Sequence, residues 1–135
     1  MKRATQIACG LLLTASGCAG VQTAAVVEQG ASFTLAPGET AAVRGTDARL
    51  TFKRVTEDSR CPVDVTCVWA GDAKIEITIS RNGAADDTRI LGITPPKQEA
   101  TVGNLRIRFV SLAPVPRQAD AVPRKYRAEF VVDQL

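Results

Sequence analysis

The residue types best suited to chemistry or recognition lie close together in the chain, between positions 59 and 72. Cys61 and Cys67 are separated by five residues, and a turn of this length brings two Cα atoms within the range of a disulfide bond. A bridge that closes a ring of about seven residues is worth roughly 2 kcal/mol in the chain-entropy model. The bridge therefore serves mainly to make the loop rigid.

Trp69, the only tryptophan of the chain, follows this pair and can be interpreted in two ways. It either fills the core behind a stapled corner, or it belongs to a rigid recognition surface. In the second interpretation, polar side chains project from the stapled turn, and the candidates are Arg60, Asp64 and Thr66.

Catalytic chemistry has little support, because the chain contains no histidine and so lacks the usual general base and zinc ligand. Bridged cysteines supply no nucleophile. The remaining options are an adjacent acidic pair, Glu57 with Asp58 or Asp86 with Asp87, and a serine with a lysine as its base. Neighbouring residues of a strand point to opposite faces, so the two carboxylates of a pair would not act on one substrate. We therefore expect each acidic pair to be solvated in a turn. The sequence predicts no catalytic residues, and we expect the protein not to be an enzyme.

Three carboxylates near the cysteines, those of Asp58, Asp64 and Asp72, could in principle attract calcium, which binds several oxygen ligands. Their spacing matches no calcium-loop pattern. The five-residue gap between the cysteines also differs from the two-residue gap typical of thiol redox sites. We therefore expect no metal and no cofactor.

The motif Asp-Ser-Arg-Cys-Pro, followed by four residues, Cys, one residue and Trp-Ala-Gly, lies within residues 57–73. It resembles a family of small, largely uncharacterised bacterial envelope proteins, which are often lipoproteins. The resemblance implies a secreted β domain with a disulfide bond. It supplies no catalytic residues.

The N-terminus has the pattern of a secretory signal peptide. Lys2 and Arg3 precede an apolar segment, Ile7–Ala15, that is too short to span a bilayer. The sequence Ala-Ser-Gly before Cys18 resembles a lipobox, so we expect residues 1–17 to be removed and Cys18 to be lipidated. Ordinary cleavage near this point, or a retained anchor, are the alternatives.

Residues 18–31 are small and almost uncharged, which suits a flexible tether between the lipid and a domain over residues 32–135. Three acyl chains on one cysteine would anchor the protein firmly in the membrane. By resemblance to lipoproteins, Ala19 after the cysteine favours the outer membrane. The domain would then lie in the periplasm or at the cell surface.

Composition narrows the function classes further. Removal of Lys2 and Arg3 with the signal peptide leaves 15 basic residues against 14 acidic ones, so the mature protein is nearly neutral and nucleic acid is not an expected partner. Of four cysteines, Cys9 leaves with the signal peptide and Cys18 takes the lipid. The remaining two are expected to pair in an oxidising compartment.

The domain reads as short strands separated by turn residues, with a period of two in hydrophobicity. The clearest is residues 73–80, and a slip in alternation at Lys53-Arg54 predicts a β-bulge. About seven strands predict an all-β fold, either an antiparallel β-sandwich or a small open barrel. The expected strands lie near residues 33–35, 41–44, 50–55, 73–80, 88–93, 105–109 and 125–132.

A second candidate binding surface is cationic. If the last two strands pair, four basic side chains share an outward face that could meet lipid headgroups or anionic envelope glycans. These are Arg106, Arg108, Lys125 and Arg127. A solvated face, balanced in part by Glu129 and Glu76, is the alternative.

Together these features predict a membrane-anchored envelope lipoprotein with a non-enzymatic β domain that binds an envelope protein or anionic glycan. The alternative is an envelope hydrolase or inhibitor whose site the sequence does not locate.

Overall fold

The computed structural model describes residues 23–120 and 124–135, so the predicted signal peptide and the lipidation site Cys18 lie outside the described residues. The described part forms nine β-strands, and it contains no helix long and apolar enough to cross a membrane. The strands are β1 (Ala25–Val27), β2 (Ser32–Leu35), β3 (Thr40–Val43), β4 (Arg49–Asp58), β5 (Ala73–Ser80), β6 (Asp87–Gly92), β7 (Glu99–Val102), β8 (Leu105–Ala113) and β9 (Arg127–Gln134).

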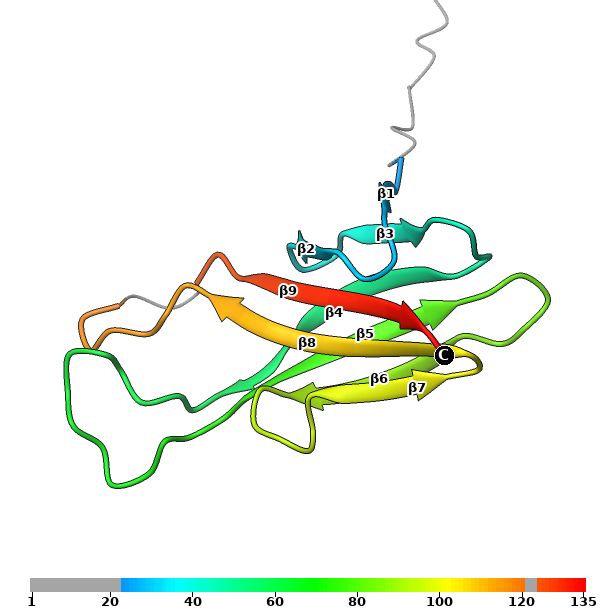
Figure 1. Cartoon of the computed structure of the whole chain (residues 1–135). Helices are drawn as coiled ribbons and strands as arrows, with labels where there is room; N and C mark the ends of the chain where they lie inside the picture. The colour runs from blue at the N-terminus through cyan, green and yellow to red at the C-terminus, as the bar shows by residue number, and fades with distance from the viewer. Residues whose placement is uncertain (1–22, 121–123) are drawn as a thin grey trace, which may run out of the picture.

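The strands form two sheets packed face to face (Figure 1). The first sheet has the order β1-β3-β4-β5-β6 and the second the order β2-β9-β8-β7. Neighbouring strands are antiparallel, except that β1 is parallel to β3. The sheets do not close into a barrel, which confirms the predicted β-sandwich.

The core lies between the two sheets and follows the alternation of the sequence. In β5, Ala73, Ile75, Ile77 and Ile79 are buried, while the residues between them are half-buried. Such alternation places one face of a strand in the core and leaves the other to solvent. The predicted bulge in β4 is also confirmed, because the pairing with β5 shifts register between Phe52 and Arg54.

Phe130 of β9 joins the two sheets. Its ring centroid lies 6.0 Å from those of Phe33 and Phe109 in its own sheet and 6.0 Å from that of Phe52 in the opposite sheet. Aromatic rings bury large apolar areas and are stabilised by tilted or edge-to-face contacts at this separation. The packing of Phe130 therefore couples both layers.

Two strands were absent from the sequence-based expectation. The predicted tether, residues 18–31, contains β1, whose Val27 packs against the core. The predicted loop after Pro96 contains β7, of which only Val102 is buried. The pairing of β1 with β3 and of β7 with β8 supplies the hydrogen bonds that hold these two strands.

The connections between strands differ strongly between the two ends of the sandwich. At one end lie residues 36–39, 59–72 and 93–98 together with the β8–β9 connection, and we call this the loop end. The opposite end carries the connections β1–β2, β3–β4, β5–β6 and β7–β8, none of which is as long as β4–β5 or β8–β9. Figure 1 shows the two longest connections, β4–β5 and β8–β9, side by side. Binding residues concentrate on loops that a rigid scaffold positions, so the loop end is where a site is expected.

Replacing Phe130 by Ala should lower the free energy of unfolding by about 3–5 kcal/mol, because it removes a large side chain from a core that cannot collapse around the cavity. Denaturant unfolding would measure this loss. Val110→Ala on β8 is the matched control, because Val110 is 38% exposed and should cost less than about 0.5 kcal/mol. Similar losses in both variants would contradict the assigned core.

Candidate functional site

The β4–β5 hairpin continues beyond its strands as a narrow stalk. The backbone N–H of Ser59 donates to the carbonyl of Asp72 at 2.8 Å, and that of Cys61 donates to the carbonyl of Ala70 at 3.0 Å. The predicted disulfide between Cys61 and Cys67 is present, with the two Cα atoms 5.9 Å apart. The bridge closes the stalk into a ring, which we call the Cys loop, residues 61–67.

The stalk requires a glycine at position 71. Gly71 has a φ of +70°, and a Cβ atom at this position would lie 1.7 Å from the carbonyl oxygen of Ser59. Only glycine combines a positive φ with so close an approach of the opposite chain. Gly71 therefore fixes the geometry by which β4 and β5 approach the Cys loop.

A buried ion cluster lies at the base of the stalk. The side chain of Asp58 is only 6% exposed, and its carboxylate accepts hydrogen bonds from Arg60 Nε at 2.8 Å and Arg60 Nη2 at 2.9 Å. Arg124 Nη1 donates to the same carboxylate at 2.9 Å, and the Tyr126 hydroxyl donates at 3.0 Å. We call these four residues the Asp58 cluster.

The cluster fastens the Cys loop to the β8–β9 connection. Arg60 donates from Nη1 to the carbonyl of Leu112 at 2.6 Å and from Nη2 to that of Pro114 at 3.0 Å. Further out, backbone N–H groups connect the same two segments. Val63 donates to the carbonyl of Pro116 at 3.0 Å, and Gln118 donates to the Asp64 carboxylate at 2.9 Å.

The environment of Asp58 favours its charged form. Burial of the carboxyl acts to raise its pKa, but the hydrogen bonds and positive charge of Arg60, with a hydrogen bond from Tyr126, outweigh this effect and hold the pKa at about 2. Burial, together with the hydrogen bond to Asp58, in turn raises the pKa of Tyr126. The cluster is therefore ionic and fully formed at neutral pH.

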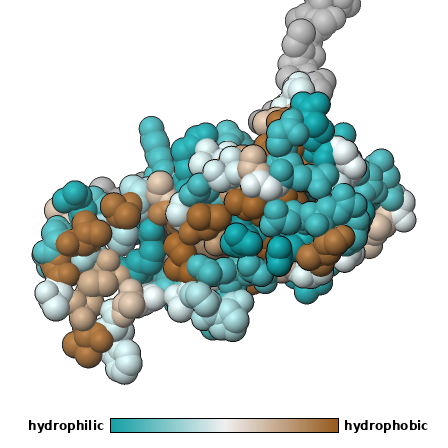
Figure 2. All heavy atoms as spheres, in the orientation of Figure 1, coloured by the Kyte–Doolittle hydropathy of each residue, from teal (hydrophilic) through white to brown (hydrophobic). Residues whose placement is uncertain are grey.

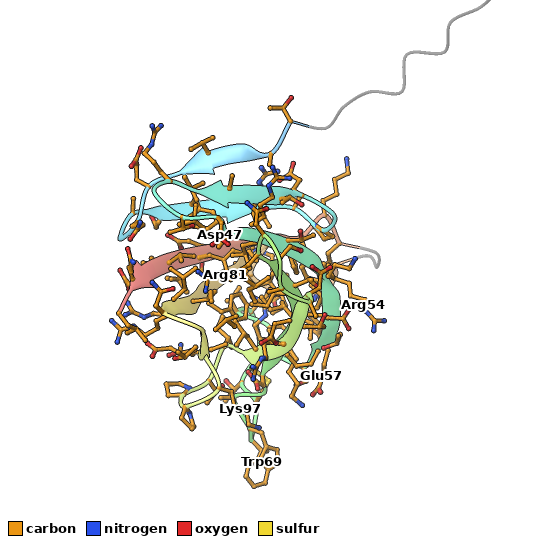
Figure 3. The ribbon with its side chains drawn as sticks, turned by 90° about the vertical axis from the view of Figure 1, so that its right-hand side faces the viewer. Asp47, Arg54, Glu57, Trp69, Arg81 and Lys97 are labelled. Carbon is orange, nitrogen blue, oxygen red and sulfur yellow. A yellow bond between two sulfur atoms is a disulfide. The ribbon has the colours of Figure 1, made fainter. Side chains whose placement is uncertain are left out.

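Exposed apolar side chains occur on the two longest connections of the loop end. Val68 is 91% exposed, Trp69 83%, Val63 58% and Val115 57%, and these four residues form what we call the apolar tip. Figure 2 shows hydrophobic residues on the projecting lobe, and Figure 3 shows the Trp69 side chain pointing away from the sandwich. Trp69 is thus not a core residue, and the interpretation of it as a core plug is wrong.

The polar residues predicted to project from the Cys loop behave differently from one another. Asp64 and Thr66 are exposed, as expected. The Arg60 side chain is only 12% exposed and points inward to the Asp58 cluster, so its assignment as a projecting contact is wrong. Arg60 positions the loop and is not free to meet a partner.

The predicted cationic stripe is not a free positive surface. The strands β8 and β9 pair as expected, but Arg108 lies 2.9 Å from a Glu99 oxygen, and Arg106 lies 3.8 Å from one of Asp133. Arg127 sits at the other end of β9, 3.9 Å from Glu39, and Lys125 precedes the strand. The balancing carboxylates are therefore not the expected Glu129 and Glu76, which lie against Ser111 and Arg54.

The three carboxylates considered for calcium each have other partners. Asp58 belongs to the ion cluster, and Asp64 accepts the Gln118 N–H. Asp72 accepts the backbone N–H groups of Ala73, Ile93 and Thr94 at 2.9, 3.0 and 3.2 Å, which fastens the end of β6 to the stalk. Within residues 23–120 and 124–135, no three metal-ligating side chains converge.

Sequence reasoning missed the residues that clamp and extend the site. Arg124 and Tyr126 contact Asp58 across more than sixty positions of the chain, and no local pattern indicates such a pairing. Val63, Val68 and Val115 belong to no periodic segment. The only sign of these valines in the sequence was the presence of apolar residues in turns rich in proline and glycine.

Comparisons with protein-family models, curated proteins and solved structures find no match to this chain. The resemblance of the cysteine motif to envelope proteins therefore stays a prediction.

Replacing Asp58 by Asn should destabilise the fold by about 3 kcal/mol, because it leaves two largely buried arginines without a counter-charge. Asp86→Asn, in the exposed β5–β6 turn, is the matched control and should have little effect.

The same pair of variants tests the low pKa. A carboxylate whose pKa is depressed on folding contributes stability that is present above its ordinary value of 3.8 and is lost as the pH falls toward about 2. Unfolding free energies measured through this range should fall more steeply for the native protein than for Asp58→Asn. Equal slopes would contradict the ionic cluster.

Replacing both Cys61 and Cys67 by Ser should lower the stability by roughly 2 kcal/mol, because the ring is short, and should leave the sandwich folded. Thermal unfolding monitored by circular dichroism would test this. Complete loss of the β signal, or free thiols in the native protein, would show that the account of the Cys loop is wrong.

Proposed function

We propose that this protein is a lipid-anchored envelope protein that binds a partner through its loop end and catalyses no reaction. Cleavage before Cys18 and acylation of this residue would hold the domain at the membrane, and Ala19 favours the outer membrane. The Cys61–Cys67 bridge supports an extracytoplasmic location, because disulfides persist in oxidising compartments.

The observation that carries the binding proposal is the apolar tip on a rigid support. Soluble domains rarely expose a tryptophan and three valines together unless the surface contacts a partner. Tryptophan is also enriched among the residues that dominate binding energy. Because the bridge and the Asp58 cluster hold the loop before binding, less conformational entropy is lost on association.

Two hollows of the described surface can be compared with what glycoside hydrolysis needs. One, of about 630 Å³, lies between residues 23–25 and the β2–β3 turn, with Glu39 and Arg127 as its charged lining residues. A second, of about 460 Å³, contains Asp47 and Arg81, which are ion-paired. Neither brings two carboxylates together, as acid–base hydrolysis of glycosides requires.

Replacing Cys18 by Ala should release the protein from the membrane fraction with its domain still folded, because the lipid adds nothing to the core. Cell fractionation and labelling with a radioactive fatty acid would measure the release and the loss of acylation. Cys9→Ala is the matched control, since Cys9 belongs to the expected signal peptide and the variant should stay in the membrane. Membrane retention of Cys18→Ala equal to that of the control would contradict the lipoprotein proposal.

A further inference from the structure

The apolar tip and the strand through which the chain enters the domain lie on opposite sides of the sandwich. Ala25 of β1 pairs with Ala41 of β3, and Ala41 pairs with Leu50 of β4, so the three residues lie side by side across the sheet. From Leu50 the chain runs to Cys61 at the stalk, which is roughly 30–35 Å at the rise of an extended strand. Figure 1 shows β1 at the top of the domain and the β4–β5 connection projecting at the lower left, and Figure 3 shows Trp69 at the bottom.

The tether is shorter than the sequence suggested, because β1 is part of the sheet. The covalent chain from Cys18 to Ala25 extends at most about 25 Å. If Cys18 is acylated, as the proposed function holds, β1 stays within this distance of the bilayer. The tip then reaches the same bilayer only if the sandwich lies on its side.

The surroundings of the tip also distinguish between a lipid surface and a protein. Anionic lipid attracts clustered basic residues and repels carboxylates. The outer parts of the two connections, which the Val63–Pro116 and Gln118–Asp64 hydrogen bonds join, carry exposed polar side chains of mixed charge, namely Asp64, Thr66, Arg117 and Gln118. An apolar centre with a mixed polar rim is typical of a protein–protein interface.

We infer that the occupant of the apolar tip is a second protein, which receives Trp69 and Val68 in an apolar pocket on the side of the domain away from the anchoring membrane. This inference rests on the proposed function and adds the class of partner and its direction. The tip is the projecting half of the contact, and the partner supplies the concave half.

The test places a photo-crosslinking amino acid at Val68 of the full-length lipidated protein in intact cells. Ile90 on β6 is the matched control, because it is also apolar and 53% exposed but lies on the edge of the sheet. We expect a protein adduct of discrete mass at position 68 and not at position 90, and mass spectrometry identifies the adduct.

Trp69 then reports directly on the complex, because it is the only tryptophan of the chain. Adding the purified partner, chosen or substituted so that it lacks tryptophan, should shift the Trp69 emission to shorter wavelength. Trp69→Ala should weaken the affinity about 30-fold or more, as expected for a central aromatic contact. Vesicles of phosphatidylethanolamine and phosphatidylglycerol should leave the emission unchanged.

A lipid adduct at Val68 together with an emission shift on vesicles would contradict the inference of a protein partner. The proposed function of an anchored binding protein would still hold. The crosslinked protein, once purified, would overturn the pocket if it left the Trp69 emission unchanged and bound Trp69→Ala as tightly as the native protein. Absence of any adduct at Val68 would overturn both this inference and the binding function proposed for the loop end.

Discussion

The negative charge of Asp58, buried at the end of the sandwich, is the interaction on which the arrangement of the loop end depends. Moving a carboxylate and two guanidinium groups out of water is costly, and the cost is offset only where each charge has close partners. Here Arg60 and Arg124 approach one carboxylate from two different connections. The disulfide closes a ring within one hairpin, whereas the Asp58 cluster joins segments far apart in the chain.

The consequence is a rigid support for side chains that do not contribute to folding. Val68 and Trp69 are more exposed than any other large apolar residues among those the structure describes. Their exposure lowers solubility and adds nothing to the core, while the bridge, Gly71 and Arg60 hold the chain that presents them. Exposed apolar side chains on a rigidly held loop are expected where the choice of residues serves association rather than folding.

The sequence predicted those features that depend on neighbouring residues. The alternation of residues 73–80, the bulge after Phe52 and the pairing of nearby cysteines follow from local geometry and are present. It failed where distant segments decide the outcome. The strand β1 exists because β3 pairs with it, and Arg60 turns inward because Asp58 and the β8–β9 connection receive it. Neither partner lies within a local window.

The measurement that tests the central claim most directly is amide hydrogen exchange at the loop end of the folded protein. The N–H groups of Cys61, Val63 and Gln118 have partners across the stalk or between the two connections, so their exchange should be slowed well beyond that of Val68 at the tip. In Asp58→Asn, protection at Val63 and Gln118 should be lost while the amides of β5 stay protected. Unprotected Val63 and Gln118 in the native protein, or protection unchanged in Asp58→Asn, would contradict a loop end held in place by the buried charge.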